Sequence, residues 1–448
     1  MQAYELLHAE GYLVMKKGAG TFIATNAAAH GHKYSEAAGQ DNHPGMLMNA
    51  SQVQSAVHSP VGLREEKIEQ ALYDFRHGVP SWEAFPMDRW QKALQDACRM
   101  ATPEILGYGP AEGSEALRQE IARLLRSTRS IPAVPERIII TAGATQAIDI
   151  ISRLFLQRGH QVIVEDPSHT VLRGIFSFSG GEVISVPVDE EGLCVQDIEN
   201  SIAEQSGGKA AVKLIYVTPS HQFPAGMTMS QQRRAELLDY ARQKEAYIIE
   251  DDYDSEYRYI GQKTTALAGL DSSDRVIYVG SFSKSLFPAL RIGYVVLPAS
   301  LIESFLAIKC ITSRMTPALE QEALARFIRS GQYARHVNQM SKLYSGRRSC
   351  LVQSLAQCFQ DRARTYGDEA GLHLLIQLKT PVKEEAIADK AIQSGLKIYP
   401  ARDYFVASKP ESASFLLGYA NLTEHQIRTG IELFAEAEEC CRREKGLL

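Results

Sequence analysis

The sequence predicts an α/β fold in which a mainly parallel sheet is covered by helices on both faces. From about residue 68 onward, short apolar runs alternate with longer amphipathic stretches such as 229–245. This alternation is typical of strands joined by crossover helices. A chain of 448 residues also exceeds what one hydrophobic core usually serves, so we expect more than one domain. The runs expected to be strands are 138–140, 162–164, 214–217, 247–249 and 276–279.

The N-terminal part has a different character. Residues 3–10 have helical composition, and Gly11 suits a helix end. A glycine-rich turn at 16–20 then separates two short apolar segments, which predicts a hairpin. Residues 26–67 are rich in Ala, His, Gly, Ser, Asn and Gln without a sustained period, which is typical of a linker.

Composition narrows the class of protein. The formal net charge of -5 carries no global signature of nucleic-acid binding, although a small basic module is compatible with it. Seven cysteines form no metal-type C-x-x-C pair, so we predict no metal site and a reduced compartment. No stretch has the apolar length of a membrane span, and the N-terminus lacks the apolar core of a signal peptide. We therefore expect a cytoplasmic protein without a membrane partner.

The most informative pattern is the segment 281–294, which reads SFSKSLFPALRIGY. An apolar run precedes it, so Lys284 is expected where a buried strand ends, which is where α/β folds bind ligands. A desolvated lysine amine is nucleophilic near neutral pH. Ser281, Ser283 and Arg291 can hold a phosphate dianion through their hydroxyl and guanidinium groups. This combination predicts a pyridoxal phosphate Schiff base at Lys284.

Two further strand ends carry groups that suit the same cofactor. The segment TAGATQ leads from the first apolar run into a helical stretch, so the backbone at Ala144 and Thr145 can form an anion site. Acidic residues follow the run that ends at residue 249. Either Asp251 or Asp252 can pair with a protonated pyridine nitrogen, and the Tyr253 hydroxyl can bond the cofactor's phenolate.

Two histidines follow other predicted strands. His221 lies in a loop constrained by two prolines and a glycine, where its ring can also bond the phenolate. His169 follows the run 162–164, and its flat ring can stack on the pyridine face. Separate strand ends thus offer phosphate, ring, phenolate and Schiff-base contacts at one edge of the sheet.

With these motifs, residues from about 70 to 448 resemble the fold-type I, aspartate-aminotransferase-like pyridoxal phosphate enzymes. The resemblance implies a large cofactor-binding domain over 68–310 and a smaller C-terminal α/β domain over 311–448. It implies that Lys284 is the Schiff-base lysine and that Asp251, rather than Asp252, pairs with the pyridine nitrogen. The phosphate contacts that it implies are Arg291, Ser281, Ser283, Ala144 and Thr145, with Tyr253 on the phenolate.

The resemblance also implies a homodimer. Tyr108, in the segment GYGPAEG, resembles the tyrosine that reaches the phosphate bound by a partner subunit. The segment EALR at 115–118 continues the family pattern. We therefore expect active sites at an interface between two copies of the chain.

Two segments narrow the resemblance to the MocR/GabR group of transcriptional regulators. They are TPSHQFP at 218–224 and EDDYDSEYRY at 250–259. This group joins a GntR-type winged helix-turn-helix to an aminotransferase-like domain. Residues 3–13 resemble the end of a recognition helix, and residues 16–23 resemble the wing, whose lysines can meet DNA phosphates.

A helix-turn-helix places a supporting helix before its recognition helix, and nothing precedes Met1 here. We therefore expect residues 1–25 to be a partial winged helix, with DNA as a partner only if the missing portion is present.

The resemblance leaves two functional classes. In the first, a small amine or amino-acid effector exchanges into the aldimine at Lys284, and the signal controls transcription. In the second, the chain is a stand-alone aminotransferase acting on an amino acid, with transaminase activity that is residual or complete. Related aminotransferases grip the substrate carboxylate with an arginine of the C-terminal domain. The stretch 414–419 has none, which leaves Arg402 as the candidate, and His169 replaces the usual stacking aromatic.

Overall fold

The computed structural model describes residues 13–16, 20–23, 71–207, 210–261, 264–407, 410 and 412–446. The chain divides into two compact units, Met1–Val53 and Gln54–Leu448. In the first unit, β1 (Leu13–Lys16) pairs antiparallel with β2 (Gly20–Ile23), as the predicted turn at 16–20 requires. The predicted helix at 3–10 and the linker at 26–67 lie outside the described residues.

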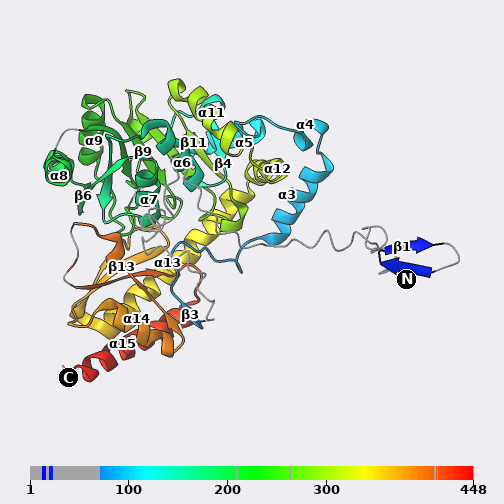
Figure 1. The fold of residues 1–448 in the computed structure, drawn as a ribbon. Helices are drawn as coiled ribbons and strands as arrows, with labels where there is room; N and C mark the ends of the chain where they lie inside the picture. The colour runs from blue at the N-terminus through cyan, green and yellow to red at the C-terminus, as the bar shows by residue number, and fades with distance from the viewer. Residues whose placement is uncertain are drawn as a thin grey trace. The chain divides into compact units, whose positions relative to one another are not determined.

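The second unit is built on an eight-stranded sheet, in the order β4-β11-β10-β9-β8-β5-β6-β7 (Figure 1). Strands β10, β9, β8, β5 and β6 pair in parallel, whereas β11 pairs antiparallel with both of its neighbours. This confirms the predicted mainly parallel sheet. The strands are β4 (Ile138–Thr141), β5 (His160–Asp166), β6 (Glu182–Asp189), β7 (Gly192–Leu193), β8 (Ala211–Val217), β9 (Tyr247–Asp252), β10 (Val276–Ser281) and β11 (Gly293–Val296).

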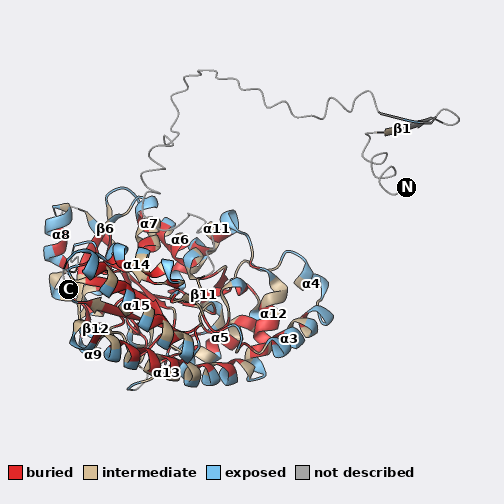
Figure 2. Cartoon of the chain, turned by 90° about the horizontal axis from the view of Figure 1, so that it is seen from below, coloured by how far each residue is buried: buried red, intermediate tan, exposed pale blue. Residues whose placement is uncertain are grey.

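Alternate residues of these strands enter cores on opposite faces of the sheet, because successive side chains of a strand point in opposite directions. In β4, Ile139 packs with helices of one face, while Ile138 and Ile140 pack with helices of the other. Figure 2 shows the buried residues gathered on the central strands and the inward sides of the helices. Both faces of the sheet are therefore covered, which explains why its strands read as continuous apolar runs.

Two groups of helices make these layers. The first face packs against α6 (Ala144–Phe155), α7 (Thr170–Phe178) and α11 (Ile302–Thr312). The opposite face packs against α3 (Met87–Arg99), α5 (Glu115–Thr128), α12 (Ala318–Arg329), α8 (Ile198–Ser206), α9 (Gln231–Gln243) and α10 (Leu267–Leu270). The short α4 (Pro103–Leu106) follows α3. Among the described residues, no helix combines the length and the apolar character needed to cross a membrane.

Side-chain caps mark several helix starts. Ser114 accepts the backbone N–H of Leu117 at the start of α5, and Ser230 accepts that of Arg233 at the start of α9. These bonds satisfy amide groups that have no partner inside the helix.

A smaller antiparallel sheet, in the order β12-β13-β16-β15, forms the centre of a second domain. Its strands are β12 (Ala363–Tyr366), β13 (His373–Leu378), β15 (Tyr399–Pro400) and β16 (Ala413–Gly418). Its core includes residues of α13 (Gln332–Phe359), α14 (Glu384–Gln393) and α15 (Glu424–Glu444). Thr423 and Gln426 form a capping box at the start of α15. The predicted smaller α/β domain is thereby confirmed.

The two cores meet along α13, which runs from the large domain into the small one (Figure 1). Tyr333 belongs to the core of the large sheet and Met340 to that of the small sheet, while Val337 packs against both. The cores thus change within α13, C-terminal to the predicted boundary after residue 310. Phe75, predicted in the large domain, also packs in the small core.

An early segment of the chain joins the small domain and then enters the functional cavity. β3 (Tyr73–Asp74) pairs in parallel with β14 (Leu396–Lys397), and the backbone N–H of Gly418 donates to the Phe75 carbonyl over 2.8 Å. These contacts position His77 and Gly78, which line the cavity described below. The close approach at Gly418 requires a residue without a side chain, because an added Cβ would collide with the Arg76 carbonyl group.

We predict that Gly418→Ala lowers the free energy of unfolding by about 1–3 kcal/mol, the usual cost of overpacking a closely packed position. Chemical denaturation would measure this change. Gly174→Ala is the matched control, because no other group lies within 4 Å of its added Cβ in α7. Alanine also favours a helix, so the control is expected to retain full stability or gain slightly. Equal stability of the two variants would contradict the close packing at Gly418.

Candidate cofactor site

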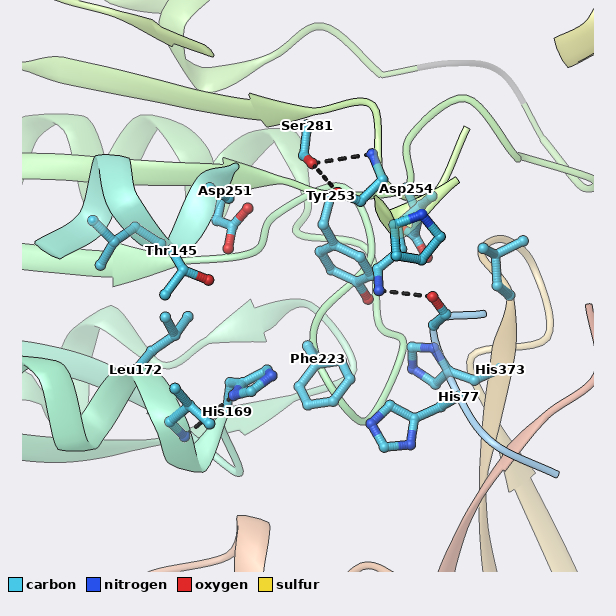
Figure 3. A pocket seen from close by; sticks show the side chains of 18 of the residues that line it. His77, Thr145, His169, Leu172, Phe223, Asp251, Tyr253, Asp254, Ser281 and His373 are labelled. Carbon is cyan, nitrogen blue, oxygen red and sulfur yellow. Dashed lines mark hydrogen bonds between the residues drawn. The ribbon is translucent and has the colours of Figure 1, made fainter. Parts of the chain in front are cut away.

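A cavity of about 280 Å³ lies at the carboxyl ends of the parallel strands. Its lining comes from the ends of β9 and β10, the start of α6, the loop between β5 and α7, and two segments packed with the small domain (Figure 3). Crevices at this edge of an open α/β sheet are where such folds bind ligands. The sequence-predicted residues that line the cavity are Ala144, Thr145, His169, Asp251, Tyr253, Ser281, Ser283, Lys284 and Arg291.

Lys284 follows β10 and extends its amine across the cavity. Its Nζ donates a hydrogen bond of 2.8 Å to the carbonyl oxygen of Gly78. Burial lowers the pKa of the Lys284 amine, while the nearby charges of Asp254 and Asp251 act in the opposite direction. A lowered pKa increases the neutral, nucleophilic fraction of the amine near neutral pH.

Asp251 and Asp252 are neighbours at the end of β9, but they serve opposite faces of the sheet. Asp251 lines the cavity, where Tyr216 donates to its Oδ2 over 2.7 Å and its buried Oδ1 has no hydrogen-bond partner. Burial raises the pKa of Asp251 to about 7. Asp252 instead pairs with Arg129 at 2.7 Å and accepts from Tyr278. The unpartnered oxygen of Asp251 therefore fits the protonated ring nitrogen of a pyridine cofactor.

Tyr253 lines the cavity, whereas His221 lies behind it. The Tyr253 hydroxyl donates to the His221 carbonyl oxygen over 2.9 Å and lies 3.0 Å from His221 Nδ1. That nitrogen also lies 2.9 Å from a carboxylate oxygen of Asp254. His221 is thus placed to position the Tyr253 hydroxyl, rather than to reach into the cavity itself.

His221, Asp254 and His373 also form a group whose possible metal-ligand atoms lie within 4.8 Å of one another. Two members of this group, His221 and Asp254, already form a hydrogen bond with each other.

The end of the cavity beside the N-terminus of α6 is suited to a phosphate group. Ser281 and Ser283 lie within hydrogen-bond distance of each other, with their Oγ atoms 3.0 Å apart. The Arg291 guanidinium donates to the Ala142 carbonyl oxygen over 2.8 Å, beside the N-terminus of α6. Free backbone N–H groups at that terminus attract anions, and a guanidinium binds phosphate bidentately. Gly293 lies so close to the backbone of Gly143 that a side chain does not fit there. An added Cβ would lie 2.7 Å from the backbone carbon of Gly143.

His169 forms part of the cavity wall. Its Nδ1 accepts the backbone N–H of Val171 and so caps α7, and its ring centroid lies 5.1 Å from that of Phe223. Burial, with nearby Lys284 and Arg173, lowers the pKa of His169 to about 4. The ring is therefore a neutral flat surface at physiological pH.

Besides His221, two predicted residues do not line this cavity. Tyr108 is 80% exposed, and the Arg314 guanidinium lies 3.9 Å from the centroid of its ring. Arg402 is exposed at the start of the short helix η7 (Arg402–Tyr404). Each role suggested for these residues remains a prediction.

Several lining residues were missed by sequence reasoning, namely His77, Gly78, Tyr216, Phe223, Asp254, Leu372 and His373. Tyr216, Phe223 and Asp254 lie inside the segments 214–217, 218–224 and 250–259, so their proximity to a strand end was a usable signal. His77, Gly78 and His373 come from segments that reach the cavity only through packing of the small domain, and they carry no local signal.

The fold and this site define a fold-type I protein dependent on pyridoxal phosphate, and comparisons with known proteins agree. The model of the family "Aminotransferase class I and II" matches residues 73–434. A structure of the multiple substrate aminotransferase from Thermococcus profundus superposes with a TM-score of 0.77 at 28% identity, over 89% of this chain and 97% of that one. A kynurenine aminotransferase from Pyrococcus horikoshii, solved in complex with PMP, superposes with a TM-score of 0.76 at 27% identity, over 88% of this chain and 95% of that one.

The most similar relatives that we report indicate the group within this family to which the chain belongs. The chain is 34% identical to the HTH-type transcriptional regulator YdeL of Bacillus subtilis, over 96% of this chain and 86% of the relative. It is 31% identical to the probable rhizopine catabolism regulatory protein MocR of Rhizobium meliloti, over 97% of this chain and 84% of the relative. The chain belongs to the aminotransferase class I and II family, among the MocR-type regulators. Its cofactor is pyridoxal 5′-phosphate.

We predict that Tyr216→Phe weakens cofactor binding about fivefold, because Asp251 loses a hydrogen bond worth about 1 kcal/mol. Titration of the apoprotein with pyridoxal phosphate would measure the dissociation constant. Tyr240→Phe is the control, since the Tyr240 hydroxyl bonds Glu199 at the surface, 2.9 Å away. An unchanged constant in Tyr216→Phe would show that Tyr216 does not support Asp251.

Proposed function

We propose that this chain is a pyridoxal phosphate-dependent transcriptional regulator that recognises a small amine or amino acid through Lys284. One observation carries the proposal. The amine of Lys284 is buried in a cavity together with an unpartnered carboxylate oxygen of Asp251. A nucleophile and a partner for a ring nitrogen are thus held in one site, and the relatives that share nearly the whole chain are named as regulators.

The residues assigned to the cofactor divide its groups among them. Arg291, Ser281, Ser283 and the start of α6, with Ala144 and Thr145, would hold the phosphate. Asp251 would face the pyridine nitrogen, Tyr253 the phenolate oxygen and His169 the ring. When bound, the cofactor supplies an aldehyde that condenses with amines and a ring that withdraws electrons.

Lys284 gives this site its selectivity for amines. Its neutral form can attach to the cofactor, and an incoming amine can displace it. The carbonyl oxygen of Gly78, 2.8 Å from Nζ, offers a place for the released amine to donate a hydrogen bond. The lysine therefore serves as the displaced group in sensing and as a proton carrier in any turnover.

Contacts between the domains offer a route from the cavity to the rest of the protein. Around His169, Ser168 donates its N–H to the Tyr404 carbonyl oxygen over 3.0 Å, and Arg173 donates to the same oxygen over 2.7 Å. Asp166 accepts the backbone N–H groups of Val406 and Ala407. The cavity wall that contains His169 is thus tied to a loop of the small domain. A ligand that moves this wall would shift the small domain, and DNA-binding segments linked to the same unit would respond.

The proposal includes a homodimer in which Tyr108 completes the partner's site. Tyr108 is exposed and does not line the cavity of its own chain. Its ring is held by Arg314, so it is presented in a defined position rather than left without a contact.

A stand-alone aminotransferase is the second candidate, favoured by the close match to aminotransferase structures over most of this chain. The two functions differ in turnover. Formation of a keto-acid product over many cycles would favour the enzyme, whereas an amine-dependent change in DNA occupancy without product would favour the regulator.

We predict that the purified protein has a visible absorption band from the bound cofactor and that Lys284→Ala abolishes it. The variant lacks the amine that attaches to the cofactor, so amines added later should also fail to displace a protein-bound group. Lys342→Ala, an exposed lysine of α13, is the control and should keep the band. A band of unchanged position and intensity in Lys284→Ala would refute the assignment.

We further predict that Tyr108→Phe weakens cofactor binding about tenfold, through loss of one hydrogen bond to the charged phosphate. Hybrid dimers of Tyr108→Phe and Lys284→Ala subunits should recover one site of native affinity, because the Lys284→Ala subunit supplies the missing hydroxyl. Absorption titration of the separated hybrid would test this. Hybrids that bind as weakly as Tyr108→Phe alone would mean that Tyr108 does not serve the partner.

A further inference from the structure

We infer that the cavity selects a primary amine that carries neutral hydroxyl groups in place of an α-carboxylate, such as an amino alcohol. The inference rests on the proposed function, because it concerns the ligand recognised at Lys284. It comes from the charges and hydrogen-bonding groups that face the cavity.

The cationic side chains that line the cavity already have roles in the proposed function. Among the described lining residues, Lys284 and Arg291 are the only lysine and arginine. Lys284 is the group that an incoming amine displaces, and Arg291 lies at the phosphate end beside α6. No described lining guanidinium is left for a ligand carboxylate.

The arginines around the cavity have other partners. Arg173 donates to the backbone oxygens of Ser168, Asp403 and Tyr404. Arg76 lies 3.4 Å from an Asp74 carboxylate oxygen and donates to the Tyr399 hydroxyl. Arg402 is exposed and outside the lining. A carboxylate in the cavity would therefore meet the acidic groups Asp251 and Asp254 without a matching cation.

The small domain presents an apolar cluster next to Phe223. Leu416 of β16 and Leu375 of β13 are buried against Phe223, together with Ala401 and Phe405. Phe223 is itself part of the cavity lining. A charged ligand group placed against this wall would lose its hydration without gaining an ion pair.

Two imidazoles with unpartnered ring nitrogens lie at the same end of the cavity. His77 and His373 have ring centroids 6.5 Å apart, and Figure 3 shows them at the end away from Thr145 and Leu172. The buried Nδ1 of His77 and Nε2 of His373 have no hydrogen-bond partner. Such atoms are costly to leave unsatisfied, so a ligand that bonds them gains affinity.

Both rings are neutral near pH 7. Burial lowers the pKa of His77 to about 3 and that of His373 well below its ordinary value, with nearby cationic or imidazole groups acting in the same direction. The buried Nε2 of His373 has no hydrogen-bond partner, so in the neutral ring it can act as an acceptor. A neutral acceptor matches a hydroxyl donor and offers no charge to a carboxylate.

The test is an absorption titration of the holoprotein with three probes. 2-Amino-1,3-propanediol and L-serine differ only in a hydroxymethyl group against a carboxylate, and isopropylamine lacks both polar groups. We expect half-saturation by the diol at a concentration at least tenfold lower than for L-serine, and also lower than for isopropylamine. Binding of L-serine equal to or tighter than that of the diol would overturn the inference, including the case in which a partner subunit supplies an arginine.

Variants at the imidazoles test the hydroxyl contacts. His373→Phe should raise the half-saturating concentration of the diol severalfold and leave that of isopropylamine within about twofold. If that variant does not fold, His77→Phe provides the same comparison. An equal change for both probes would overturn the hydrogen-bonding role. A spectrum that no probe alters, with the band still dependent on Lys284, would refute amine recognition itself and so the proposed function, whereas a preference for L-serine would refute this inference alone.

Discussion

The parallel pairing of β9 with β10 is the constraint on which the site depends. In this register Asp251 lies opposite Val279 and Asp252 opposite Gly280, so the segments that carry Tyr253 and Lys284 leave the sheet at one edge. Because side chains alternate across a strand, Asp251 faces the cavity and Asp252 faces Arg129 on the other side. A shift of one residue would exchange the two carboxylates and separate the ring partner from the lysine.

Burial then sets the chemistry of the groups that this register brings together. It lowers the pKa of the Lys284 amine, raises that of Asp251 to about 7, and keeps the lining imidazoles neutral. These effects have one cause, since a low-dielectric wall penalises whichever form of a group is charged. Burial thus disfavours the charged forms of the amine, of the Asp251 carboxylate and of the imidazoles that line the cavity.

The small domain supplies one wall of the cavity, while the large domain supplies the residues assigned to the cofactor. The turn at residues 77–78 and the start of β13 at residues 372–373 line the cavity, and a hydrogen bond from Gly418 of β16 ties the segment before this turn to the small sheet. This separation is consistent with one fold serving aminotransferases and regulators alike.

The sequence by itself determined the sheet and the residues that follow its strands. Lys284, Arg291, Tyr253 and the pair Asp251 and Asp252 could be identified because strand ends of a parallel sheet converge, and each motif is local. Only the tertiary structure decided which aspartate faces the cavity, placed His221 behind Tyr253, and brought Gly78 to Lys284 across 206 residues of sequence. Contacts of that kind depend on how two cores pack, and no local pattern of apolar and polar residues encodes that packing.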